Sequence, residues 1–146
     1  MITFNVTKKS DDKNVAQAVL NQTYGITLED RKNLTNAITQ GALDDTTLLK
    51  YLDSVYEGQM TEKGYSSIMK NRVPTKVINT TSEENSDLKV NSIQLESRDA
   101  IQGSKCYAFS VKVETVKETT KTFTFKGNIV LIRENGHWKV NDITQK

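Results

Sequence analysis

TFTFKGNIVLIRENGHWKVNDI, residues 122–143, consists of two alternating apolar runs on either side of Asn135-Gly136. This dipeptide is the strongest short-range signal for a β-hairpin, because a type I′ turn needs two residues that tolerate positive φ. A two-residue turn sets Glu134 opposite His137. The residues that then share one face are Phe123, Phe125, Ile129, Leu131, Trp138 and Val140. A slip of one residue would move this whole set to the solvent side, so the pattern predicts the register of the hairpin as well as its existence.

The residues before this hairpin predict more of the same sheet. Residues 106–116 alternate cleanly and place Tyr107, Phe109, Val111 and Val113 on the inward side. A plain two-residue loop to the next strand would bury lysines, so we predict a three- or five-residue connection within residues 117–121, or a bulge. Residues 88–97 form a further strand in which the apolar positions change parity, which indicates a bulge near Asn91-Ser92. Gly127 lies on the inward parity, where a missing side chain marks a bend.

The first half of the chain has helical periodicity instead. Good N-cap types or acidic residues begin each segment, and glycine or proline ends it. The expected helices are residues 10–24, 27–41, 44–58 and 61–73. Pro74 ends the fourth helix, because the residue before a proline disfavours the α region. After it, Val77-Ile78 is predicted as a brief strand and residues 80–87 as a mobile polar loop.

The order of these elements decides the fold class. Helices come first and strands second, without alternation, which predicts an α+β fold. It would have three to four N-terminal helices packed on a strongly curved antiparallel sheet of four to five strands. A chain of 146 residues with 36% hydrophobic and 26% charged residues is the size and composition of one soluble domain. We expect a flexible lead-in at residues 1–10 and a single cone-like domain at residues 11–146.

The composition argues against several classes of function. The formal net charge is +2, and the basic residues are not clustered, so there is no strong nucleic-acid signal. With one histidine, His137, and one cysteine, Cys106, no histidine-based metal cluster can form, and no carboxylates are grouped at ligand spacing. We therefore expect no metal. No cofactor is expected either, because the chain lacks a glycine-rich phosphate loop and the Gly-x-Ser-x-Gly and Cys-x-x-Cys motifs.

Asp142 and Tyr107 are the candidates for an acid–base site. Strict hairpin register places Asp142 on the core side opposite Ile129, where burial would raise the pKa of its carboxyl and suit it to general-base catalysis beside Tyr107. A bulge or strand end at Asn141-Asp142 explains the same position without any chemistry. We prefer that interpretation, and assign no catalytic residue.

Trp138 and Arg133 form the candidate binding surface. The predicted register makes them cross-strand neighbours, so the guanidinium can stack on the indole. Trp138 alternatively caps the hydrophobic core. His137 is expected to be an exposed turn residue. Cys106 is expected to be a small, buried hydrophobic residue within a strand.

Two motifs support a resemblance to a known superfamily. Thr-x-x-Gly-Tyr at residues 61–65 introduces the fourth helix, and Gly-x-Trp-Lys-Val at residues 136–140 ends the last hairpin. Together with three preceding helices and curved strands, residues 11–146 resemble the nuclear transport factor 2-like, or cystatin-like cone, superfamily. The ending is similar to that of small exported domains from Gram-positive bacteria. The superfamily includes isomerases, dehydratases, transport adaptors and the assembly subunits of type IV conjugation systems, so the fold selects no function by itself.

The resemblance and the absence of a catalytic grouping lead to one expectation of function. The chain would be a non-enzymatic, extracytoplasmic interaction or assembly domain of a membrane-associated complex, such as a conjugative type IV secretion scaffold. Its partners would be other protein subunits, including copies of itself, and a membrane would be reached only through an anchor upstream of this sequence. The alternative is a small-molecule-binding or isomerase-like domain with a pocket in the cone, and the alternative location is the cytoplasm.

Overall fold

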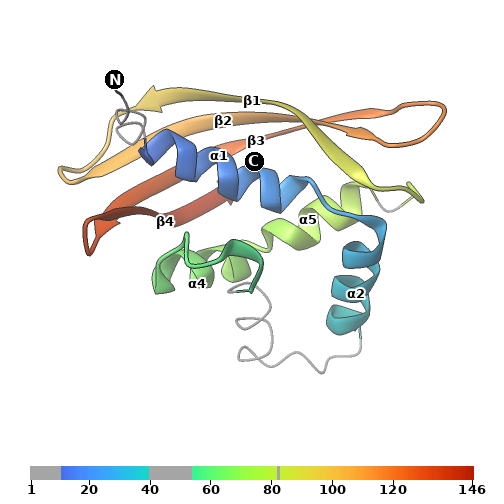
Figure 1. The fold of residues 1–146 in the computed structure, drawn as a ribbon, viewed down its shortest axis with the longest axis horizontal. Coiled ribbons are helices and arrows are strands. Elements are labelled where there is room, and N and C mark those ends of the chain that lie inside the picture. The colour runs from blue at the N-terminus through green and yellow to red at the C-terminus, as the bar shows by residue number, and fades with distance from the viewer. Residues whose placement is uncertain (1–10, 40–53, 82) are drawn as a thin grey trace, which may run out of the picture.

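The computed structural model describes residues 11–39, 54–81 and 83–146. Its elements are α1 (Asp11–Tyr24), α2 (Leu28–Thr39), α4 (Glu62–Lys70), α5 (Val73–Thr80), β1 (Leu88–Arg98), β2 (Ser104–Thr115), β3 (Thr122–Glu134) and β4 (His137–Gln145). Residues 54–56 are also helical. Helices therefore precede strands, and the four strands form an antiparallel sheet that curves over the helical layer (Figure 1). The predicted α+β class is confirmed.

The β3–β4 hairpin has the predicted turn and register. Glu134 pairs with His137 and Arg133 with Trp138, across a turn whose residues Asn135 and Gly136 have φ of 55° and 83°. Both central residues of a type I′ turn need positive φ, which is why asparagine followed by glycine stands there.

The other strand connections also keep the apolar residues on one face. Val113 pairs with Phe123, so that the inward rows of β2 and β3 face each other. The backbone N–H of Thr115 donates to the carbonyl of Lys121 at 2.9 Å, which closes a five-residue connection at residues 116–120. In β1 the pairing with β2 shifts between Val90 and Ser92, where the bulge was predicted.

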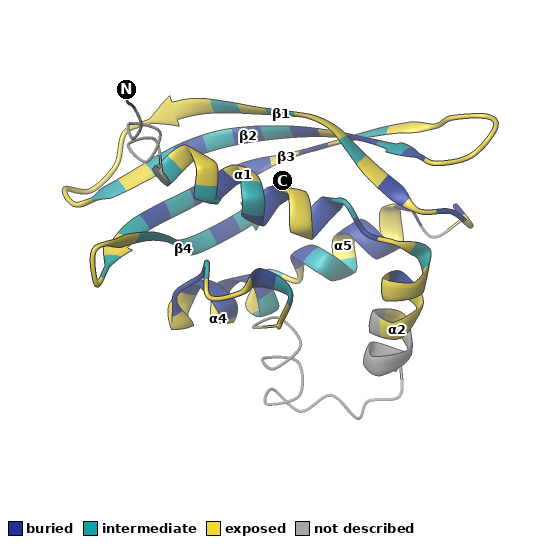
Figure 2. Cartoon of the chain, viewed as in Figure 1, coloured by how far each residue is buried: buried dark blue, intermediate teal, exposed yellow. Residues whose placement is uncertain are grey.

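In the described residues, the helices lie on one face of this sheet (Figure 2). The core between the two layers joins Ala16, Val19 and Leu20 of α1, Ile68 of α4, Val77 of α5, and Val111, Val113, Ile129, Leu131, Val140 and Ile143 of the sheet. Each of these side chains is fully buried. Of the six hairpin residues predicted to face inward, Phe123 and Trp138 are half-buried against this cluster and the other four are buried.

α4 fastens the helical layer to the edge of the sheet. Thr61 caps its N-terminus, as predicted, by accepting the Gly64 N–H at 2.9 Å. The backbone of Val140 in β4 bonds to this layer twice, with its N–H donating to the Gln59 carbonyl and its carbonyl accepting the Thr61 N–H, both at 2.9 Å. No helix in the described part of the chain is long and apolar enough to cross a membrane.

The structure corrects two of the predictions. Val77 and Ile78 lie in α5, not in a strand. Pro74 stands in the first turn of this helix, where its missing N–H costs nothing and its fixed φ suits the helix, so it begins a helix as well as following one. The segment predicted as a mobile polar loop at residues 80–87 contains the buried residues Glu84 and Ser86, so part of it packs against the rest of the protein. The predicted lead-in at residues 1–10 and most of the predicted helix at residues 44–58 lie outside the described residues.

Candidate interaction surface

The turn end of the β3–β4 hairpin carries a pair of one aromatic and one cationic side chain. The guanidinium carbon of Arg133 lies 5.6 Å from the centroid of the Trp138 ring, which confirms that the two are stacked neighbours. Arg133 is exposed and Trp138 is half-buried, so the indole both packs against the core and presents an edge to solvent. A cation–π contact at an exposed site contributes about 0.5–1 kcal/mol.

A groove of about 350 Å³ runs beside this pair, between the hairpin and α1. Its walls are Asn14, Val15 and Ala18 of α1, Gln59, and His137 and Trp138 of the hairpin. The three α1 residues share one side of that helix, because positions three and four apart lie above one another. Val15 and Ala18 are half-buried there.

The lining of this groove suits association more than catalysis. It combines a small apolar floor with amide groups, an imidazole and an indole, and no carboxylate belongs to it. Tryptophan, tyrosine and arginine are enriched among the residues that contribute most to protein–protein binding. His137 is exposed here, at the turn position that the sequence predicts.

Asp142 does not lie on the core side. The register shifts between Val130 and Leu131, so that Asp142 pairs with Val130 and Ile143 turns inward opposite Ile129. The strict register that set Asp142 opposite Ile129 is therefore wrong, and the bulge interpretation is confirmed. The Asp142 carboxylate accepts a hydrogen bond from the Ser67 hydroxyl of α4.

Tyr107 has a different partner from Asp142. Its hydroxyl donates to the Asp12 carboxylate in the first turn of α1. Burial, and after it this hydrogen bond to an acid, raise the pKa of Tyr107 to about 12. The structure thus uses both proposed acid–base residues to fasten a helix to the sheet, and it does not bring them together.

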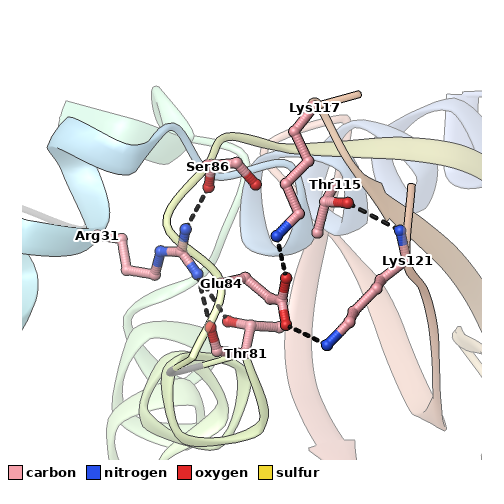
Figure 3. A network of polar contacts seen from close by, with 7 residues as sticks. All are labelled: Arg31, Thr81, Glu84, Ser86, Thr115, Lys117 and Lys121. Atoms are coloured by element: carbon pink, nitrogen blue, oxygen red, sulfur yellow. Dashed lines mark hydrogen bonds and ion pairs between the residues drawn. The ribbon is translucent and has the colours of Figure 1, made fainter. Parts of the chain in front are cut away.

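A buried polar cluster that the sequence prediction did not include joins α2, the loop between α5 and β1, and the β2–β3 connection (Figure 3). Arg31 of α2 is only 5% exposed and reaches into the loop between α5 and β1. Its guanidinium donates to the carbonyl and hydroxyl oxygens of Thr81, both at 3.0 Å, and to the Ser86 carbonyl. The Thr81 carbonyl also accepts the Glu84 N–H at 2.9 Å, so the guanidinium adds a second hydrogen bond there and pairs the Ser86 carbonyl of the buried loop.

Glu84 occupies the other side of the same loop. Its carboxylate accepts hydrogen bonds from Lys117 at 2.7 Å and from Lys121 at 3.1 Å, both at the β2–β3 connection. These two hydrogen bonds hold the pKa of the Glu84 carboxyl below its ordinary value. A signal for this cluster was present in the sequence, since Arg31 precedes Leu34 and Ile38 at helical spacing and so shares their apolar stripe.

One reactive side chain remains, the single cysteine of the chain. Cys106 is a free thiol that is half-exposed on the outer face of β2, so the prediction of a buried cysteine is wrong. In the described part of the chain, no three His, Cys, Asp or Glu residues come together in a way that could hold a metal ion.

Comparison with known proteins bears on the fold. No protein-family model matches this sequence, and no curated protein matches it. A solved structure of a periplasmic fragment of TraM is similar over 94% of this chain and 96% of that chain, with a TM-score of 0.54 and 11% sequence identity. A second solved structure, Rd1NTF2_05_I64F_A80G_T94P_D101K_L106W, covers 92% of this chain and 100% of its own at 11% identity, with a TM-score of 0.34 that is too low to support any conclusion. The chain thus shares its overall fold with the periplasmic TraM fragment.

Proposed function

We propose that this chain is a non-enzymatic, extracytoplasmic interaction domain that takes part in assembling a membrane-associated complex. More specifically, we propose a component of a conjugative type IV secretion scaffold. The observation that carries the proposal is the likeness to a periplasmic fragment of TraM, which extends over nearly all of both chains. We also propose that this chain is a member of the nuclear transport factor 2-like superfamily.

The groove beside Trp138 is the surface through which the domain would bind its partners. Trp138 and Arg133 supply the aromatic and cationic anchor, and the Gln59 amide can pair with a partner backbone. The partners would be other protein subunits of the complex, including further copies of this chain. An isomerase-like function is not favoured, because Asp142 and Tyr107 are each engaged elsewhere.

A substitution that fills the groove tests this proposal. Ala18→Arg places a long cationic side chain in the groove, whereas Gln17→Arg adds the same side chain to an exposed neighbouring position of α1. Each variant replaces the wild-type gene in the native host, and DNA transfer between cells is counted. We expect Ala18→Arg to reduce transfer at least 100-fold and Gln17→Arg to leave it within about threefold, because a hot-spot contact contributes roughly 2–4 kcal/mol.

The thermal midpoint of each purified variant serves as the control for folding. If both variants fold like the wild type and Ala18→Arg transfers DNA normally, the groove is not the assembly surface. If deletion of the whole gene leaves transfer unchanged, the proposed role in conjugation is wrong.

A further inference from the structure

The two edge strands of the sheet differ in what lies beside them. The strand order is β1-β2-β3-β4, so β1 and β4 are the edge strands. The edge of β4 is bonded to residues 59–61 through Val140. β1 forms the upper border of the fold in Figure 1, and among the described residues no strand pairs with its outer edge. An unpaired strand edge is a template for a further strand.

The hydrogen bonds of the sheet show which backbone groups of β1 point outward. Thr115 of β2 donates its N–H on the side of β3. Successive residues of an antiparallel strand direct these groups to alternate sides, so Lys112 directs its own toward β1. Lys112 pairs with Ser92, whose groups therefore face β2, and those of the next residue, Ile93, face outward. By the same alternation Leu95 also directs its N–H and carbonyl away from the sheet.

The core-facing side chains of these two outward residues are partly uncovered. Ile93 pairs with Val111 and Leu95 with Phe109. The two β2 residues are 0% and 3% exposed, whereas Ile93 and Leu95 are only half-buried. The difference arises because β1 has a neighbouring strand of the described sheet on one side only. A strand added outside β1, with apolar residues on the same face, would cover them.

The devices that protect sheet edges leave the centre of this one open. A bulge interrupts β1 just before Ser92, and the exposed ion pair of Glu96 and Arg98 lies at the other end. Bulges and charged side chains keep foreign strands away from an edge. Between them, residues 92–95 carry no charged side chain. A partner strand therefore fits only if it is short and uncharged along this stretch.

β1 itself, in the reverse direction, has the sequence that this stretch requires. Ile93-Gln94-Leu95 consists of an apolar residue, an amide and an apolar residue in either direction. A second copy that runs antiparallel, with Gln94 on a two-fold axis, sets each Ile93 opposite the other copy's Leu95 on the core-facing side. The outward backbone groups of these residues then face one another. Glu96 lies opposite Ser92, so no like charges are in contact.

Other antiparallel registers fit this edge less well. Leu95 on the axis would set Ile93 opposite Ser97, and so place an apolar side chain beside a hydroxyl. Ile93 on the axis would set Leu95 opposite Asn91, at the bulge. Glu96 on the axis would bring two carboxylates face to face, which destabilises the pairing. A shift by one residue would set core-facing side chains opposite outward ones.

We propose that two copies of this chain pair through β1, antiparallel and with Gln94 on the two-fold axis, and so join their sheets into one. The partner is a second copy because the edge is complementary to itself, as an isologous contact requires. This inference rests on the proposed function only in that copies of the chain are among its partners, and it uses β1, whereas the groove beside Trp138 involves β4. The contact is small, so it is weak between free molecules and becomes stronger where several copies are held in one complex.

Disulfide trapping in the whole 146-residue chain tests the register. Cys106→Ser first removes the natural thiol. Adding Gln94→Cys places two thiols in a non-hydrogen-bonded pair, whose Cα atoms lie about 4.5 Å apart, within the range of about 4.4–6.8 Å that a disulfide accepts. Adding Ser92→Cys instead, on the same exposed face of β1, leaves the two thiols about 13 Å apart along the strands. Under mild oxidation we expect Gln94→Cys to form at least about tenfold more covalent dimer than Ser92→Cys.

Amide hydrogen exchange of the wild type, measured by NMR, tests the edge itself. The amides of Ser92, Gln94 and Glu96 face β2 and should be protected at every protein concentration. The amides of Ile93 and Leu95 should exchange fast in dilute solution. At about 1 mM protein, where the dimer forms, we expect their exchange to be at least about threefold slower.

Three results would overturn the proposal. One is equal trapping of Gln94→Cys and Ser92→Cys, which would indicate random collision. Another is fast exchange of the Ile93 and Leu95 amides at every concentration, which would show that the edge stays open. The third is slow exchange of these amides at every concentration, which would show that the edge is covered within a single molecule. None of these results depends on DNA transfer, so pairing through β1 can fail while the proposed assembly role stands.

Discussion

Gly127 is the residue at which two strands and an aromatic ring approach most closely. A Cβ atom built on it would lie 1.9 Å from the Thr144 carbonyl oxygen and 2.7 Å from Cζ of Phe109. The first neighbour is backbone and belongs to the paired strand β4, so it cannot rotate away. The φ of Gly127 is not positive, so its backbone conformation does not require a glycine. The close approach of these neighbours does. The inward parity that the sequence assigned to this glycine is correct, and its cause is packing against β4 and Phe109.

Gly127→Ala should therefore be among the most destabilising single substitutions in the sheet. Overpacking a core position costs about 1–3 kcal/mol, and a clash with fixed backbone places this one at about 3 kcal/mol or above. Gly103→Ala is the control, because Gly103 has φ of 88° with nothing within 4 Å and incurs only the conformational cost of about 1–2 kcal/mol. Urea unfolding of both variants measures the difference. Equal destabilisation would mean that β4 relaxes away from Gly127.

At the scale of elements, the loop between α5 and β1 is where separate parts of the fold are joined. Arg31 holds it from α2, and Glu84 within it holds Lys117 and Lys121 from the β2–β3 connection. The Glu84 side chain is 5% exposed, whereas the two lysines are 37% and 61% exposed. A single carboxylate thus fixes the far end of the β2–β3 hairpin against the helical layer.

The protonation of Glu84 should make this junction sensitive to acid. The folded-state pKa of Glu84 lies below its ordinary value of 4.5, so the stabilisation is complete above pH 4.5 and is lost as the pH falls through the folded-state pKa. We expect Glu84→Gln to be less stable than the wild type at pH 7 and to lose less stability below pH 4.5. Urea midpoints at pH 7, 5, 4 and 3 measure this difference.

Glu118→Gln, on the exposed part of the same connection, is the matched control for charge. It should follow the wild-type pH profile. A Glu84→Gln profile that runs parallel to that of the wild type would show that the acid sensitivity has another source.

The elements also show what the sequence could and could not predict. The hairpin turn, the bulge of β1 and the parity of β2 against β3 follow from a period of two, which depends only on neighbouring residues. α5 was missed because the β-branched pair Val77-Ile78 favours a strand locally, and packing against α1 and α4 decides otherwise. The contacts of the Arg31–Glu84 cluster join residues 33 to 55 positions apart, and a local pattern does not report which distant carbonyls a buried arginine meets.

At the scale of the whole molecule, the helical layer and the sheet are joined along β4. Val140 pairs with Leu131 of β3 on one side, while its backbone N–H and C=O bond to residues 59 and 61 on the other. Further along, Asn71 donates to the Ile143 carbonyl at 2.8 Å, and Ser67 accepts the Ile143 N–H at 3.1 Å. An edge strand that is satisfied on both sides makes the two layers one cooperative unit.

Gly64→Ala should separate the unfolding of the two layers. A Cβ on Gly64 would lie 2.2 Å from the Val140 carbonyl oxygen, so α4 must move away from β4 and break the bonds at Gln59 and Thr61. Ser66→Ala, at an exposed position of the same helix, is the control and should be neutral within about 0.5 kcal/mol.

Unfolding is followed by far-ultraviolet circular dichroism for the helices and by the fluorescence of Trp138, the single tryptophan, for the hairpin. In the wild type and in Ser66→Ala the two signals should change together, as one cooperative transition requires. In Gly64→Ala the helical signal should be lost at a lower urea concentration than the tryptophan signal. Coincident transitions in Gly64→Ala would show that the two layers are held together by the core between α1 and the sheet, and not by the hydrogen bonds along β4.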